Sequence, residues 1–173
     1  IILGPPGAGK GTQAKQLSKI LNLKTISPGQ LLREEYTKKT KLGLEAYTYW
    51  SKGNLAPDNI IINLTLNKLP KNNYLLDGFP RTKVQAESFK NGIDRVFYIN
   101  VSDQEALRRL SLRRDGRDDE TEQALKKRIE IFYRFTKPVL GYYKEKGMLH
   151  EVNGERPIDE IHQDICKILN PVR

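Results

Sequence analysis

The stretch Gly4-Pro5-Pro6-Gly7-Ala8-Gly9-Lys10-Gly11-Thr12 decides how this chain folds. It follows a strand-like run, Ile1–Gly4, and opens a helical pattern that begins at Gly11. Glycines let the backbone turn tightly and aim successive N–H groups at phosphate oxygens, and the helix N-terminus adds partial positive charge. Lys10 supplies a full charge and Thr12 a hydroxyl near a metal. The segment therefore predicts a binding site for a nucleoside triphosphate.

One residue departs from the general pattern of such a loop. Gly11 stands where a serine or threonine usually follows the lysine, and the hydroxyl comes one residue later at Thr12. The alternative is a glycine-rich turn without a ligand, but the strand before it and the helix after it favour the phosphate site. The motif alone does not name the group that accepts a phosphoryl group.

Outward from this segment, short strand-like runs alternate with longer helical patterns. Further strands are expected at Lys24–Ser27, Tyr74–Asp77, Val96–Val101 and Leu149–Asn153. Helices are expected at Gly11–Leu23, Gln30–Lys39, Leu42–Lys52, a run capped by Asp58 and stopped by Pro70, Gln104–Arg114, Glu120–Lys137, Pro138–Lys146 and Ile158–Leu169. This alternation predicts an α/β fold, a parallel sheet with helices on both faces. No repeat or linker divides the chain.

Composition narrows the class of protein. Hydrophobic residues make up 38% of the chain, which supports a folded domain. Runs such as Ile60–Ile62 are too short to span a bilayer, and no segment resembles a secretion signal, so we expect a cytoplasmic protein. Cys166 is the single cysteine, which excludes an internal disulfide and leaves a zinc site short of thiolates. The chain opens at Ile1 inside a strand-like run, so we expect a few residues to precede it.

Two motifs together resemble those of adenylate kinases and related nucleoside-monophosphate kinases. They are Gly9-Lys10-Gly11-Thr12 and Asp77-Gly78-Phe79-Pro80-Arg81, and three shorter segments agree in the same order: Leu31-Leu32-Arg33, Gly116-Arg117 and Lys127-Arg128. The resemblance covers essentially the whole chain. It implies a P-loop fold with a five-stranded parallel sheet and helices on both faces. It also implies reversible, Mg²⁺-dependent phosphoryl transfer from ATP to AMP, giving two ADP.

The resemblance also implies one domain with two inserts. The core would comprise residues 1–26, 57–112 and 121–173. An insert at 27–56 would bind the monophosphate, and a lid at 113–120 would close over the nucleotides, excluding water and completing a cage of arginines. This lid is short, which is typical of the type without a metal.

Site residues follow from the resemblance, position by position. Charge stabilisation in catalysis is assigned to Lys10, Arg81, Arg113, Arg117 and Arg128, because guanidinium groups bind phosphates with two hydrogen bonds and stay charged. The ATP site is implied at Gly7, Ala8, Gly9, Lys10, Gly11, Thr12, Arg109, Arg113 and Arg156. The AMP site is implied at Pro28, Arg33, Asn54, Leu55, Ala56, Gly78, Phe79, Arg81, Gln85, Arg117 and Arg128. Thr12 and Asp77 would hold Mg²⁺ through water.

Gln85 favours AMP as the acceptor. Adenylate kinases use a glutamine here to hydrogen-bond adenine, whereas the similar UMP/CMP kinases carry a different residue. Trp50 either lines the base pocket or packs between short helices. Pro28 and Gln30 depart from the family, which has a threonine and an aspartate there, so they put AMP and metal affinity in question.

Three alternatives stay open at this point. A UMP/CMP kinase is a sister enzyme that a substrate panel would distinguish. A basic P-loop ATPase acting with RNA would use the net charge of +9 and would show salt-sensitive RNA binding. A kinase-like module without activity would fit Pro28 and Gln30. We expect ATP, AMP and ADP as partners, without a membrane, and the resemblance implies a monomer. We expect no nucleic acid, because phosphate sites already claim many of the arginines.

Overall fold

Five short parallel strands lie at the centre of the described part of the chain. The structure is a computed structural model that describes residues 1–89, 92–112 and 122–169. Its strands are β1 (Ile2–Leu3), β2 (Lys24–Ile26), β3 (Tyr74–Leu76), β4 (Val96–Asn100) and β5 (Leu149–Asn153). They pair as β1-β4-β5 and as β2-β3, every pair in parallel.

The two sheets meet at a single point. An isolated parallel bridge joins Ile2 to Asp77, and the N–H of Gly78 donates to the carbonyl of Ile2 at 3.0 Å. The expected five-stranded sheet is therefore present as a three-stranded and a two-stranded sheet. The reason is local: β1 spans two residues before the glycine-rich loop begins, so it is too short to form a full ladder on both sides.

Helices surround the strands. They are α1 (Lys10–Leu21), α2 (Pro28–Thr37), α3 (Lys41–Trp50), α4 (Asp58–Leu66), α5 (Lys83–Ser88), α6 (Asp103–Ser111), α7 (Glu122–Ile131), a π-helix η1 (Phe132–Thr136), α8 (Lys137–Glu145) and α9 (Ile158–Leu169). None of the helices in the described residues is both long and apolar enough to cross a membrane.

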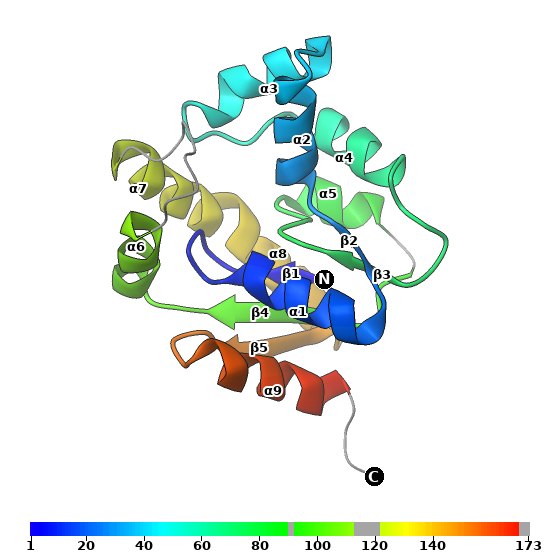
Figure 1. Ribbon diagram of the computed structural model, residues 1–173, viewed down its shortest axis with the longest axis vertical. Coiled ribbons are helices and arrows are strands. Elements are labelled where there is room, and N and C mark those ends of the chain that lie inside the picture. The colour runs from blue at the N-terminus through cyan, green and yellow to red at the C-terminus, as the bar shows by residue number, and fades with distance from the viewer. Residues whose placement is uncertain (90–91, 113–121, 170–173) are drawn as a thin grey trace.

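The period of two along the strands sends alternate side chains to two separate cores. Phe97 and Ile99 of β4 belong to a core cluster that also contains residues of α1 and α9. Val96 and Tyr98 belong to a second cluster, with residues of α5, η1 and α8. Figure 1 shows α1 and α8 on opposite sides of the strands. Both faces of the sheet are therefore covered by helices, as the alternation of patterns predicts.

Helices α2 and α3 stand at one end of the molecule, and α9 lies at the other (Figure 1). Helices α2 and α3 share a separate core cluster with α4, built on Leu32, Ala46, Ala56 and Leu64. Pro28 is the first residue of α2, where a missing N–H costs no helical hydrogen bond. The segment that would bind the monophosphate thus carries a small apolar core between its helices.

Gly43 allows α3 to lie close to α2, and this contact makes a testable prediction. A Cβ at Gly43 would collide with the backbone of Glu35 and Tyr36, whereas a Cβ at Gly141 of α8 would meet nothing within 4 Å apart from its chain neighbours and the backbone of its own helix. We expect Gly43→Ala to lower the free energy of unfolding by about 1–3 kcal/mol through overpacking. The matched variant Gly141→Ala should raise it by about 0.5–1 kcal/mol, because alanine is the better helix former.

Urea unfolding of the two variants beside the unchanged chain measures both effects. Changes of the same sign at Gly43 and Gly141 would contradict this account of the contact between α2 and α3.

Several predicted boundaries need correction. Pro57 is the N-cap of α4, so the prediction that Asp58 caps this helix is wrong; Asp58 is its first residue. The same helix ends at Leu66, short of Pro70. The helix expected over Glu120–Lys137 changes to π geometry at Phe132 and continues into α8 without a break at Pro138. The strand β5 and the helix α9 match their predicted ranges.

Candidate active site

The glycine-rich loop connects β1 to α1 with the geometry that a phosphate cradle needs. Gly7 and Gly9 both have φ of 83°, in the left-handed region that favours glycine. Gly9 is the N-cap of α1, and no side chain caps this helix end or places an acid in its first turn. The first N–H groups of a twelve-residue helix therefore face the loop, together with the positive end of the helix dipole.

The loop is fixed from outside by α6. A Cβ built on Gly7 would lie 2.5 Å from the carbonyl oxygen of Ala106, so only glycine permits this close approach. Ala8 and Ala106 both belong to the core cluster that includes α1 and α9. The loop thus rests on α6 and on the sheet, which keeps its N–H groups in place.

Lys10 folds over its own loop. Its ammonium donates to the carbonyl oxygens of Gly4 at 2.9 Å and Pro5 at 2.8 Å. A Cβ built on Gly78 would lie 3.7 Å from Cε of Lys10 and 3.2 Å from Nη2 of Arg81. The lysine and this arginine therefore approach each other next to the segment that follows β3.

The guanidinium group of Arg33 also lies close to that of Arg81, near Gly29. A Cβ built on Gly29 would lie 3.6 Å from Nη1 of Arg33 and 3.9 Å from Nη2 of Arg81. Arg81 is held by three contacts of its own: Nε donates to the Gly78 carbonyl at 2.8 Å, its N–H donates to Gln85, and its carbonyl accepts from the Thr136 hydroxyl at 3.0 Å. Two guanidinium groups thus converge at the first turn of α2.

Two cavities open around these charges. The smaller one, about 130 Å³, lies between the segment of α2 and α3, the residues after β3, and α7 with η1. The larger one, about 800 Å³, lies between the glycine-rich loop, α6 and the residues before α9. Six residues line both cavities: Pro6, Lys10, Gly29, Arg33, Arg81 and Arg128. Four of the six are cations, so the cavities meet at a strongly positive junction.

The structure brings most of the sequence-predicted residues to these cavities. Those predicted for AMP that line the smaller cavity are Pro28, Arg33, Asn54, Leu55, Ala56, Gly78, Arg81, Gln85 and Arg128. Those predicted for ATP or the metal that line the larger cavity are Gly7, Ala8, Gly9, Lys10, Gly11, Thr12, Asp77, Arg109 and Arg156. Arg113, Arg117 and the lid at 113–120 lie outside the described residues.

Phe79 has a different setting from the one expected, whereas Trp50 has both of the settings that the sequence left open. Phe79 is fully buried in a core cluster and packs against Phe89 with ring centroids 5.6 Å apart, so its side chain faces the core. Trp50 lines the smaller cavity and also packs edge-on against Tyr36 and Tyr47, so both of its predicted roles are present.

Some lining residues were not predicted. Thr136 is the last residue of the π-helix. The wider turn of a π-helix has no signature in the apolar pattern of the sequence, so the position of Thr136 could not be predicted. Glu105 lines the larger cavity between two arginines. The spacing of Glu105 and Arg109, four residues apart with the acid first, is a signal that could have identified the pair.

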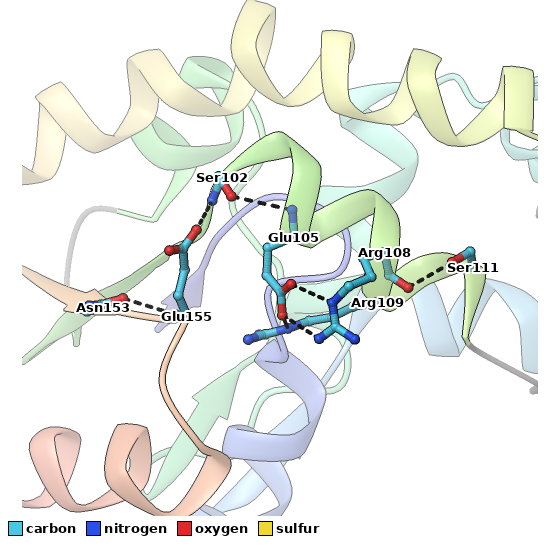
Figure 2. A network of polar contacts seen from close by, with 7 residues as sticks. All are labelled: Ser102, Glu105, Arg108, Arg109, Ser111, Asn153 and Glu155. Carbon is cyan, nitrogen blue, oxygen red and sulfur yellow. Dashed lines mark hydrogen bonds and ion pairs between the residues drawn. The ribbon is translucent and has the colours of Figure 1, made fainter.

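Figure 2 shows Glu105 between the guanidinium groups of Arg108 and Arg109. Its carboxylate accepts from Nε of Arg108 at 2.7 Å and from Nε of Arg109 at 2.6 Å. Arg108 is the more exposed of the two, with 59% of its side chain accessible against 24% for Arg109. The acid therefore fixes the direction of Arg109 at the rim of the larger cavity.

A second contact in Figure 2 joins the residue before α6, Ser102, to the loop after β5. The carboxylate of Glu155 accepts from the N–H of Ser102 at 2.9 Å, and hydrogen bonding to Ser102 lowers the pKa of Glu155. Arg156, the next residue, forms an ion pair with Asp164 of α9. The segment after β5 is thus anchored on both sides where it borders the larger cavity.

The hydrogen bonds of Glu105 predict that the stability of the fold depends on pH. Hydrogen bonds from Arg108 and then Arg109 lower the pKa of the Glu105 carboxyl from its ordinary 4.5 to about 2. Because the folded-state pKa lies below the ordinary value, the contribution of this group to stability is complete above pH 4.5. It is lost as the pH falls from 4.5 to about 2.

Carboxyl-carbon NMR of the folded chain should give a titration midpoint for Glu105 near pH 2. Arg108→Gln should move this midpoint upward, because it removes the largest cause of the shift. A midpoint near 4.5 in the unchanged chain would contradict the two hydrogen bonds.

Oxygen donors for a divalent cation lie at the N-terminus of α1. A Cβ built on Gly11 would lie 3.7 Å from Oδ2 of Asp77, so this carboxylate faces the first helical turn, which also carries the Thr12 hydroxyl. A carboxylate and a hydroxyl are donors that Mg²⁺ accepts while it keeps several waters, so the residues fit this metal. Among the described residues no group of three or more His, Cys, Asp or Glu could hold a metal by itself.

Gln30 lines the larger cavity with Thr12 and Asp77, and its amide is engaged along its own helix. Its Nε2 donates to Glu34 one turn later in α2, at 3.0 Å. The residue that replaces the family's aspartate is thus exposed and engaged along its own helix.

Comparisons with known proteins identify relatives of this chain. The protein-family model described as adenylate kinase matches residues 2–148. A protein named adenylate kinase from Methanocella arvoryzae is 41% identical, with 95% of each chain covered. Proteins of the same name from Clostridium perfringens and Caldicellulosiruptor saccharolyticus are 37% and 38% identical, with 98% of this chain and 97% of each relative covered. These alignments extend over 205 to 209 residues, more than the 173 of this chain, so the relatives carry inserted residues that it lacks.

Proposed function

Because the chain belongs to the adenylate kinase family, we propose that its larger cavity binds ATP and its smaller cavity binds AMP. The reaction is the reversible transfer of the terminal phosphoryl group of ATP to AMP, which gives two ADP. An oxygen of the AMP phosphate forms a bond to the γ-phosphorus while the bond from that phosphorus to the bridging oxygen of ADP breaks. No residue has to act as a nucleophile, so catalysis depends on position and charge.

The set of residues common to both cavities carries this proposal. Lys10, Arg33, Arg81 and Arg128 line the two cavities at once, so each can face the phosphates of both nucleotides. Two nucleotides bring several negative charges into one place, and fixed cations there stabilise the charge that spreads over the transferred group. A site for one nucleotide alone would not need four cations at the boundary with a second cavity.

Each part of the site has a proposed role. The N–H groups of the glycine-rich loop bind the β and γ phosphates of ATP, and Lys10 follows the transferred group. Arg33 and Arg81 hold the AMP phosphate with paired hydrogen bonds. From the family pattern, Arg117 and Arg128 bridge the two nucleotides and Arg113 acts on ATP. Arg109 and Arg156 border the ATP base.

We propose Mg²⁺ as the metal of the reaction, held through water by Thr12 and Asp77. When bound, it neutralises part of the charge on the ATP phosphates. The carboxylate of Asp77 supports this role because it faces the first turn of α1 instead of the apolar core. The protein residues then supply the remaining positive charge.

Residues 27–56 form the proposed AMP-binding insert, and a single copy of the chain is proposed to be sufficient. The small core between α2, α3 and α4 supports the assignment of this insert. The linings of both cavities support the sufficiency of a single copy, because one chain contributes the glycine-rich loop and all the shared cations.

A coupled assay of ADP formation tests the proposed function. ATP and Mg²⁺ are supplied with AMP, CMP, UMP or GMP in separate reactions. Turnover with AMP well above that with the other three is the expected result. Preference for CMP or UMP would assign a sister activity instead, and no turnover with any acceptor would contradict the enzyme.

A further inference from the structure

The side chain of Gln85 is buried and fully oriented by the protein. Only 1% of the surface of the residue is exposed, and it lines the smaller cavity. Its Oε1 accepts from the backbone N–H of Arg81 at 2.7 Å, and its Nε2 donates to Oδ1 of Asp58 at 2.8 Å. Asp58 lies 27 residues away in the chain, at the first turn of α4. The amide therefore has one partner at each of its two ends.

The chemistry of these partners permits only one orientation of the amide. A backbone N–H can only donate, and an ionised carboxylate can only accept. Turning the amide over would set the NH₂ group of Gln85 against the N–H of Arg81, and Oε1 against the carboxylate of Asp58. The identity of both neighbours therefore fixes the orientation of the amide.

Asp58 is itself held in place. The hydroxyl of Thr82 donates to the same oxygen, Oδ1, at 3.0 Å and accepts from the N–H of Gln85 at 3.1 Å. The carboxylate, the hydroxyl and the amide form a closed set of contacts between the starts of α4 and α5. The acid cannot leave Gln85 without also losing its contact with Thr82.

The remaining hydrogen-bonding capacity of Gln85 is one N–H and one lone pair on Oε1. Adenine carries an amino donor at C6 beside acceptor nitrogens of the ring, whereas a 6-oxopurine carries a carbonyl acceptor there. An amide in the observed orientation offers Oε1 to the amino group and the N–H to a ring nitrogen. A 6-oxopurine needs the opposite orientation, which Asp58 and the Arg81 N–H both oppose.

We propose that Asp58 is a specificity-determining positioning residue, which holds the Gln85 amide in the orientation that accepts adenine and rejects 6-oxopurines. Asp58 acts through Gln85 and does not touch the nucleotide. This inference rests on the proposed function, because it concerns the base of the monophosphate that the smaller cavity binds.

The test is the variant Asp58→Asn, assayed with ATP and either AMP or inosine monophosphate. Inosine monophosphate is the sharper probe because its base differs from adenine only in the 6-oxo group and the proton that it places on the ring nitrogen. Asparagine has the same shape as aspartate but can donate as well as accept, so it removes one of the two conflicts in the reversed orientation. We expect the ratio of kcat/KM for AMP to that for inosine monophosphate to fall about tenfold.

Two further variants make the result decisive. Asp58→Ala removes the partner and should change the ratio in the same direction. Glu87→Gln neutralises an exposed acid on α5, paired only loosely with Lys83 at 3.8 Å, and should leave the ratio unchanged. Thermal unfolding and ATP affinity of each variant verify that it is folded.

The outcomes separate the possible explanations. Equal losses with AMP and inosine monophosphate in both Asp58 variants would mean that the acid only supports the fold, and would overturn the proposal. An unchanged ratio in folded variants would overturn it too. Failure of the unchanged chain to use AMP would instead contradict the proposed function, and the inference would fall with it.

Discussion

Lys10→Met should lower kcat for ADP formation by about 10²–10³-fold and leave the chain folded. Methionine keeps most of the length of the side chain and removes the ammonium, which sits at the junction of the two cavities. A fixed cation acts most strongly where charge develops during transfer. Steady-state kinetics with ATP and AMP measure the effect.

The matched control for this variant is Lys15→Met. Lys15 is exposed on the same helix, α1, and lines neither cavity. Its replacement should leave kcat within about twofold, as is usual for a surface residue away from the site. A Lys10 variant that is folded and keeps more than a tenth of its kcat would contradict the role given to the lysine.

Arg81→Lys should lower kcat/KM for AMP by about 100-fold, although the charge is kept. Lysine is a point charge without the planar fork, so it cannot form paired hydrogen bonds to the AMP phosphate. It also loses the contact from Nε to the Gly78 carbonyl, 2.8 Å long, that directs the guanidinium toward Arg33. Kinetics with AMP varied at saturating ATP should show a higher KM together with a lower kcat.

Arg95→Lys is the control for the arginine. Arg95 is exposed just before β4, and it lines neither cavity. If Arg81→Lys changes AMP kinetics no more than Arg95→Lys does, the fork is not needed and the proposed clamp on AMP is wrong.

Much of the fold could be predicted from the sequence, because strong patterns mark it. The run Leu149–Asn153 and the helical pattern Ile158–Leu169 keep their predicted ranges, and the helix has apolar residues at the spacing of one helical face. Helix α5 was not predicted. It has six residues, begins at a Thr82 cap and depends on the burial of Ala86, so tertiary contacts decide it.

The candidate site was predictable where a residue type is tied to a motif. Residues Gly7 to Thr12 line the larger cavity, and the arginines Arg33, Arg81 and Arg128 line both cavities. The catalytic roles of these residues, the cytoplasmic location and the monomeric state stay predictions.

Contacts that set orientation could not be predicted in the same way. The hydrogen bond between Asp58 and Gln85 joins residues 27 positions apart, and the one between Thr136 and the Arg81 carbonyl joins residues 55 positions apart. Neither pair has a characteristic spacing, because the fold alone brings the partners together. The sequence thus indicates which groups can react, while the three-dimensional structure decides how they point.

One measurement tests the central claim, that two nucleotides meet at a shared set of cations, most directly. It is calorimetric titration with a compound in which two adenosines are joined by five phosphates, which can fill both cavities at once. The account predicts one molecule bound per chain, far more tightly than ATP or AMP alone, and competition with each of them, because one molecule makes both sets of contacts. Binding of two molecules per chain, or competition with ATP but not with AMP, would contradict it.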